Sequence, residues 1–150
     1  IAKLFNLVEP KRAYFVNKDL QQLILIRRLT KELLFDIEIV SVKTVREPDG
    51  MAMSSRNRLL TPEERKHALD LYKALLAAKK KLIDGESVIS VKNYIRNFFI
   101  SESKIELEYF EIVSTTDLRK VTEIHNNNSV SLCIAGRLGK VRLIDNISLN

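Results

Sequence analysis

The chain has 150 residues, 45% of them hydrophobic, and a formal net charge of +6. A chain of this length can bury a sizeable core, and no apolar run approaches the roughly 20 residues that cross a membrane, so we expect a globular, cytoplasmic protein without a membrane partner. The basic excess is dispersed and lacks interleaved aromatic residues, which argues against a nucleic-acid partner. The single cysteine, Cys133, excludes an internal disulfide and is predicted to be a small buried hydrophobe.

The first 42 residues predict a helix followed by a strand, a second helix and a second strand. The apolar stretch before Pro10 is typical of a helix, and residues 13–15 suit a buried strand. Asp19, with Gln22 three positions later, has the pattern of a capping box at a helix start. Residues 37–42 are rich in β-branched side chains and predict the second strand. The apolar face of the second helix comprises Leu23, Ile26, Leu29 and Leu33.

This strand-helix-strand unit should close as a right-handed parallel crossover. One crossover does not make a domain, because a parallel sheet needs further strands and helices on both faces. We therefore expect the remaining strands of the sheet to precede Ile1, and we predict an α/β protein.

The second half predicts two helices and a small antiparallel sheet. Thr61, Pro62 and Glu64 form a capping-box start, and Asp84-Gly85 ends that helix. A second helix is predicted at about 88–100. The strands are predicted at 105–109, 130–135 and 141–144, with Asn126-Asn127-Asn128 between the first two. These patterns divide the chain into a first domain at 1–57 and a second domain at 58–150.

A donor-rich loop lies before the predicted boundary, in the stretch V-R-E-P-D-G-M-A-M-S-S-R-N-R at 45–58. Pro48-Asp49-Gly50 predicts a turn. Between Gly50 and Pro62 there is no acidic residue, whereas residues 54–58 supply two hydroxyls, one amide and two guanidinium groups. Guanidinium groups match phosphate geometry and stay charged, which predicts an anion site. The alternative is a solvated turn in front of a helix.

Lys18 follows a predicted strand and precedes a helix N-terminus, where free N–H groups already favour an anion. In a parallel sheet the ligand crevice lies outside the carboxyl ends of the strands, and both Lys18 and the 45–58 loop follow such ends. The alternative for Lys18 taken alone is an ordinary surface lysine.

These segments resemble the pantothenate synthetase (pantoate-beta-alanine ligase) family. The resemblance rests on K-L-F-N-L-V-E-P, Y-F-V-N-K-D-L-Q-Q-L, the long T-V-R-E-P-D-G-M-A-M-S-S-R-N-R motif and R-L-I-D-N at 142–146. It covers essentially the whole chain and identifies it as the family's C-terminal half. It implies the second part of a Rossmann-like ATP-binding domain at 1–57, followed by an α+β lid domain with an antiparallel sheet at 58–150.

The resemblance also implies chemistry. Family members activate pantoate with ATP to pantoyl adenylate, releasing pyrophosphate, and beta-alanine then attacks to give pantothenate and AMP. Mg2+ is implied with ATP, and so is a homodimer formed through the nucleotide domain. The implied ATP contacts are Val16, Asn17, Lys18, Asp19, Val45, Met53, Ser54, Ser55 and Arg56; Lys18, Ser54, Ser55 and Arg56 are implied to be catalytic. Gln22 is implied to hold pantoate, with completion of the helix cap as its alternative role.

The sequence departs from the family at three positions. Val16 and Ser41 stand where the family usually has glycine, and Lys43 stands where it has proline. A β-branched residue at a glycine position resists a positive φ, so Val16 is expected to be strained or displaced. The chain also lacks the family's upstream His-x-Gly-His segment. A second hypothesis is therefore a non-catalytic remnant that acts at most as an interaction module and whose first 56 residues expose apolar surface.

Overall fold

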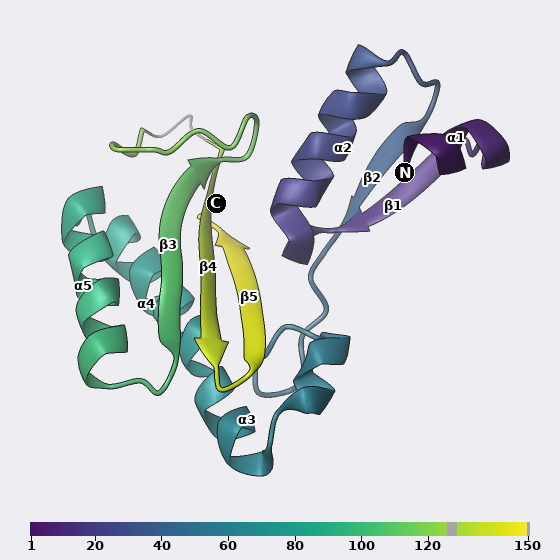
Figure 1. Cartoon of the computed structure of the whole chain (residues 1–150). Helices are drawn as coiled ribbons and strands as arrows, with labels where there is room; N and C mark the ends of the chain where they lie inside the picture. The colour runs from purple at the N-terminus through teal and green to yellow at the C-terminus, as the bar shows by residue number, and fades with distance from the viewer. Residues whose placement is uncertain (126–128, 150) are drawn as a thin grey trace. The chain divides into compact units, whose positions relative to one another are not determined.

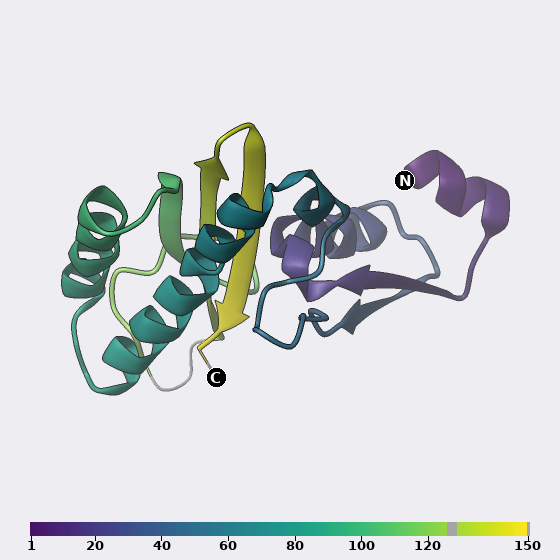
Figure 2. The same cartoon turned by 90° about the horizontal axis from the view of Figure 1, so that it is seen from below.

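A computed structural model describes residues 1–125 and 129–149 (Figures 1 and 2). The predicted separator Asn126–Asn128 lies outside the described residues. The chain forms two compact units, Ile1–Thr44 and Val45–Asn150. The division falls before the 45–58 loop, whereas the sequence predicted it after residue 57. The reason is that hydrogen bonds and ion pairs, described below, tie this loop to residues 65 and 145.

The first unit is a parallel strand-helix-strand structure, as predicted. Its elements are α1 (Ala2–Val8), β1 (Arg12–Val16), the 3-10 turn η1 (Asn17–Asp19), α2 (Leu20–Glu32) and β2 (Glu38–Val42). β1 and β2 pair in parallel, from Arg12 opposite Glu38 to Val16 opposite Val42. α2 buries Leu23, Ile24 and Ile26.

Two details of the start and end of α2 differ from the prediction. The side chain of Asp19 makes no capping hydrogen bond, because the 3-10 turn over 17–19 runs directly into α2 instead. The predicted capping box between Asp19 and Gln22 is therefore wrong, and Gln22 is exposed. Leu33 lies just beyond the last helical residue and is exposed, so it is not part of the buried face.

The two-stranded sheet leaves much of its own apolar surface uncovered. Neither strand contains a fully buried residue, so the prediction of a buried strand at residues 13–15 is wrong. Large apolar side chains are exposed throughout this unit, at Leu4, Leu7, Val8, Tyr14, Val16, Leu25, Leu33, Leu34 and Val42. The prediction that the first part of the chain exposes apolar surface is confirmed for residues 1–44.

The second unit packs helices against a three-stranded antiparallel sheet, as predicted. Its elements are η2 (Ser55–Leu59), α3 (Pro62–Ala68), α4 (Asp70–Ile83), α5 (Val88–Ser101), β3 (Glu106–Ser114), β4 (Val130–Leu138) and β5 (Val141–Ser148). The strand order is β3-β4-β5, with β4 in the centre. α4 and α5 lie along one face of this sheet (Figure 2). The predicted fold class, α/β with an antiparallel α+β part, is confirmed.

Local signals set the boundaries of these helices. Thr61 accepts from the backbone N–H of Glu64 at 3.2 Å, and the Glu64 carboxylate accepts from the N–H of Thr61 at 2.8 Å, so the predicted capping box is present. The predicted single helix is interrupted at Leu69, which separates α3 from α4. The core combines Ala68, Leu71, Leu75 and Leu82 from these helices with Val91, Ile95 and Phe99 of α5 and the inner residues of the sheet.

Cys133 lies in β4 and is buried, as predicted. Burial raises the pKa of its thiol from 9.0 to about 11. We therefore expect about a hundredfold less thiolate at pH 8 than in the unfolded chain, and the thiolate is the reactive form. Thiol titration with a disulfide reagent should show slow modification of the native protein and rapid modification in urea. Equal rates in the two states would contradict this assignment.

Candidate functional site

Residues 45–53 form a short hairpin whose tip is the predicted Pro48-Asp49-Gly50 turn. Arg46 and Ala52 form an antiparallel bridge. Across the hairpin, the N–H of Glu47 donates to Met51 O at 2.8 Å and the N–H of Met53 donates to Val45 O at 2.9 Å. Gly50 has φ 97, a left-handed conformation that glycine adopts without strain. These hydrogen bonds fix the backbone up to Met53, and so fix the point from which Ser54 and Ser55 continue.

Arg46 anchors this hairpin to the rest of the second unit. Its Nη1 donates to Asp145 Oδ2 at 2.7 Å and its Nη2 donates to Asp145 Oδ1 at 3.0 Å. The same guanidinium donates to the backbone oxygens of Gly50 and Asn146 and lies 4.2 Å from the ring centroid of Tyr72. The side chains of Arg46 and Asp145 are 19% and 5% exposed. A paired charge this buried holds the hairpin against β5 and α4.

A second network joins the hairpin to η2 and α3. The Arg65 Nη2 donates to Glu47 Oε2 at 2.7 Å and to Asp49 Oδ2 at 2.6 Å. Asn57 Nδ2 donates to Glu47 Oε1 at 3.2 Å and to Ala52 O at 3.1 Å. The hydrogen bond from Arg65, and then that from Asn57, lower the pKa of Glu47. The backbone N–H of Met51, and then Arg65, lower the pKa of Asp49.

The donor-rich loop lines an open pocket of about 600 Å³. The lining residues are Glu47, Met53, Ser54, Ser55, Asn57, Arg58 and Arg65. Ser54 caps η2, where its Oγ accepts from the N–H of Arg56 at 3.3 Å. Arg56 and Arg58 are exposed, and neither guanidinium has an ion pair with any residue that the structure describes. The pocket can therefore offer hydroxyls and at least one unpaired guanidinium to an anion.

The structure separates the predicted site residues into two groups. Met53, Ser54 and Ser55 line the pocket, Val45 pairs with Met53 at the base of the hairpin, and Arg56 follows directly but does not line the pocket. Val16, Asn17, Lys18, Asp19 and Gln22 belong to the first unit. There, η1 places Asn17–Asp19 at the carboxyl end of β1 and directly before α2.

Val16 is not strained. It has φ −79 and ψ 135, which is extended backbone that any residue adopts. Of the two outcomes expected for Val16, strain is therefore absent, and Val16→Gly has no backbone strain to relieve.

The sequence prediction missed several residues that shape the pocket. Glu47 and Arg65 line it, and Arg46 and Asp145 fix the hairpin beside it. Asn57 and Arg58 also line it; they were predicted as part of the donor-rich loop but not as ATP contacts. Arg46, Glu47 and Asn57 lie inside the motif already noted, so their position was a signal for them. Arg65 carries no local signal, because it lies far along the chain from the residues that it contacts. Asp145 lies in the R-L-I-D-N segment already noted, but nothing local pairs it with Arg46.

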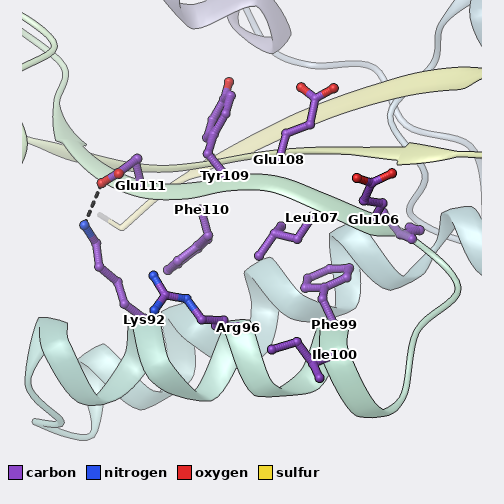
Figure 3. A pocket seen from close by; sticks show the side chains of 11 residues that line it. Lys92, Arg96, Phe99, Ile100, Glu106, Leu107, Glu108, Tyr109, Phe110 and Glu111 are labelled. Atoms are coloured by element: carbon purple, nitrogen blue, oxygen red, sulfur yellow. Dashed lines mark hydrogen bonds and ion pairs between the residues drawn. The ribbon is translucent and has the colours of Figure 1, made fainter.

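A second pocket of about 520 Å³ lies between α5 and β3 (Figure 3). Phe99 and Ile100 of α5 and Leu107 and Phe110 of β3 form its apolar lining, and Lys92 donates to Glu111 at 2.6 Å across its end. Its polar groups are thus partly paired with one another. Among the residues that the structure describes, no group of histidine, cysteine or carboxylate side chains could hold a metal ion. No described helix has the length and apolar character needed to span a bilayer.

Gly50 is expected to be essential for the hairpin. A Cβ added at Gly50 would lie 2.3 Å from Tyr72 Cε1. Gly85 has a similar φ of 90, but an added Cβ there meets nothing within 4 Å. We expect Gly50→Ala to lower the free energy of unfolding by about 1 to 3 kcal/mol more than Gly85→Ala, the difference being the steric cost. Urea unfolding of both variants measures this difference. Equal losses of unfolding free energy would show that the Tyr72 ring moves aside without an energetic cost.

The Glu47 network is expected to make stability sensitive to acid. Because the pKa of Glu47 is lower in the folded than in the unfolded chain, its contribution is complete above its ordinary value of 4.5 and is lost as the pH falls below it. Glu47→Gln should therefore flatten the fall in unfolding free energy between about pH 5 and 3. The control is Glu102→Gln, an exposed glutamate without an ion pair among the described residues. Identical acid profiles for both variants would contradict this role.

Taken together, a parallel strand-helix-strand unit and an α+β unit that carries a candidate anion site make this an α/β protein. The family model of pantoate-beta-alanine ligase matches residues 1–148. The chain belongs to the pantoate-beta-alanine ligase family.

Individual relatives agree with this assignment. The pantothenate synthetase of Thermotoga neapolitana is 43% identical over 150 residues, which are 99% of this chain and 53% of that protein. The pantothenate synthetase of Pseudothermotoga lettingae is 45% identical over 99% of this chain and 53% of its own length. The chain thus spans about half the length of the curated relatives that it matches.

Solved structures give the same result. Pantothenate synthetase from Thermus thermophilus superposes with a TM-score of 0.92 at 40% identity, over 99% of this chain and 53% of that one. Pantoate-beta-alanine ligase from Francisella tularensis, in complex with beta-gamma ATP and beta-alanine, superposes with a TM-score of 0.66 at 26% identity, over 99% and 47%.

Proposed function

We propose that this chain is the C-terminal half of an ATP-dependent ligase that condenses pantoate with beta-alanine. Pantoate's carboxylate attacks the α-phosphorus of ATP and pyrophosphate leaves; the amine of beta-alanine then attacks the pantoyl adenylate and displaces AMP, giving pantothenate. The observation that carries the proposal is the pocket lined by Ser54, Ser55 and Arg58 in a chain of this family. Fixed hydroxyls and guanidinium groups stabilise the charge that develops on phosphoryl oxygens.

Each predicted residue has a role in this proposal. Ser54, Ser55 and Arg56 bind the phosphates, with Met53 and Val45 beside the nucleotide. Asn17, Lys18 and Asp19 contact ATP where β1 gives way to α2, with Val16 before them. At this helix start free N–H groups favour phosphate. Gln22 is exposed on the first turns of α2, so its amide is available to pantoate rather than committed to the helix cap.

Mg2+ would enter with the phosphates of ATP. Glu47, which lines the pocket, and Asp49 beside it in the hairpin already accept hydrogen bonds from Arg65, and the described residues hold no cluster that fits a metal. The described residues therefore offer hydroxyl and guanidinium donors to phosphates but no separate metal site. When bound, the ion would neutralise charge on the departing pyrophosphate.

We also propose a cytoplasmic homodimer formed through the nucleotide domain. The first unit exposes apolar side chains, because a two-stranded sheet cannot bury both of its faces. This exposure supports the proposal that further strands or a second copy cover them. The same exposure favours the alternative of a non-catalytic remnant, which would use this surface for association.

The experiment joins this chain to the half of the Thermotoga neapolitana protein that it does not match. We expect the hybrid to form pantothenate from pantoate, beta-alanine and ATP, with one AMP released per product, whereas either half alone forms none. A hybrid that folds and binds ATP but forms no pantothenate would contradict the proposal and support the non-catalytic alternative.

A further inference from the structure

The R-L-I-D-N segment at 142–146 belongs to β5 and contributes no residue to the pocket. Its Asp145 is nevertheless the partner of Arg46 in the hairpin, 99 positions away in the chain. We propose that Arg46 and Asp145 are a pair of positioning residues that hold the donor loop in the geometry required for the ATP phosphates. This inference rests on the proposed function and adds the means by which that site is held in place.

The geometry of the pair suits this task. Asp145 accepts hydrogen bonds from Nη1 and Nη2 of Arg46 and also from the backbone N–H of Asn146 at 2.8 Å. The guanidinium in turn reaches the backbone of both elements, at Gly50 O in the hairpin and at Asn146 O in β5. A planar fork can satisfy these acceptors and stack on Tyr72 at the same time, which the ammonium group of lysine cannot.

Only a short segment of chain separates the anchored Arg46–Ala52 bridge from the hydroxyl donors of Ser54 and Ser55. Arg46 bridges to Ala52 across the hairpin, and Met51 and Ala52 are buried beside it. Ser54 and Ser55 follow within three residues of Ala52 and line the pocket. Asn57 also donates to Ala52 O, so the end of the loop is tied to the same buried point. A shift of Arg46 would therefore move the hydroxyls that face the phosphates.

The first test uses the chain as it stands. Asp145→Asn keeps the shape of the side chain and removes its charge, while Lys79→Met is the matched control, because Lys79 donates to Ser148 O of the same strand from α4. We expect the N–H groups of Glu47, Gly50 and Met53 to exchange with solvent about tenfold faster in Asp145→Asn, with no change for the amides of β4. Equal acceleration in the hairpin and in β4 would mean that the pair serves global stability, and would overturn the inference.

The second test uses the hybrid ligase described above. We expect Arg46→Lys and Asp145→Asn to lower kcat/KM for ATP by about a hundredfold, because displaced donors no longer stabilise the charge on the phosphates in the transition state. The KM for pantoate should stay unchanged. If the hairpin amides of a variant exchange faster but its kcat/KM for ATP is unchanged, the pair does not position the donors, and the inference is overturned. A hybrid without any activity would refute the proposed function instead, and the exchange result would still decide whether the pair holds the loop.

Discussion

Ile134→Ala is expected to lower the free energy of unfolding of the second unit by about 3 to 5 kcal/mol. Ile134 lies in the central strand β4, pairs with Phe110 on one side and Asp145 on the other, and is 0% exposed. Its truncation removes apolar contacts and leaves a cavity that strands on both sides prevent from closing. The loss should appear as a lower urea midpoint with an unchanged slope.

The matched control is Ile89→Ala on α5, because Ile89 is 71% exposed in the same unit. We expect its free energy of unfolding to stay within about 0.5 kcal/mol of the starting protein. Comparable losses for the two variants would mean that β4 is not the centre of the core.

Arg56→Ala is expected to lower the rate of adenylate formation in the hybrid ligase about a hundredfold, equivalent to roughly 3 kcal/mol. Arg56 follows the two serines of the pocket, and no described residue competes for its guanidinium through an ion pair. Loss of a charge-assisted contact to the developing phosphate charge should reduce turnover rather than stability. Single-turnover measurement of pyrophosphate release reports this step directly.

Arg96→Ala provides the control, since Arg96 is an exposed arginine of α5 without an ion pair among the described residues. Its replacement should leave pyrophosphate release unchanged. If Arg56→Ala also released pyrophosphate at the normal rate and bound ATP normally, Arg56 would belong to the solvated surface, and Arg58, which lines the pocket, would be the guanidinium to test.

Features encoded by neighbouring residues could be predicted from the sequence. The capping box at Thr61, the turn at Gly50 and the three strand patterns depend on residues a few positions apart, and the structure confirms each of them. The break at Leu69 and the 3-10 turn before α2 were missed, because packing rather than local propensity decides such irregularities.

The contacts that fix the candidate site were beyond prediction for a different reason. Any of the chain's acidic residues could pair with Arg46, and only the folded sheet brings Asp145 to it. The same applies to Glu47 and Arg65. The division between the two compact units differs from the predicted boundary for the same reason, since these long-range pairs attach residues 45–57 to the second unit. The donor-rich character of the loop could be predicted from the sequence, but the long-range ion pairs that hold the loop could not.

The central position of β4 also determines when the second unit can form during synthesis. β4 begins at Val130 and β5 ends at Ser148, so the strand that α4 packs against leaves the ribosome well after the helices that cover it. Until then α4 and α5 have no complete sheet to cover their apolar faces, and Arg46 has no partner. Folding of this unit therefore waits for β4 and β5, and loss of β5 alone would remove both one side of the sheet and the anchor of the donor loop.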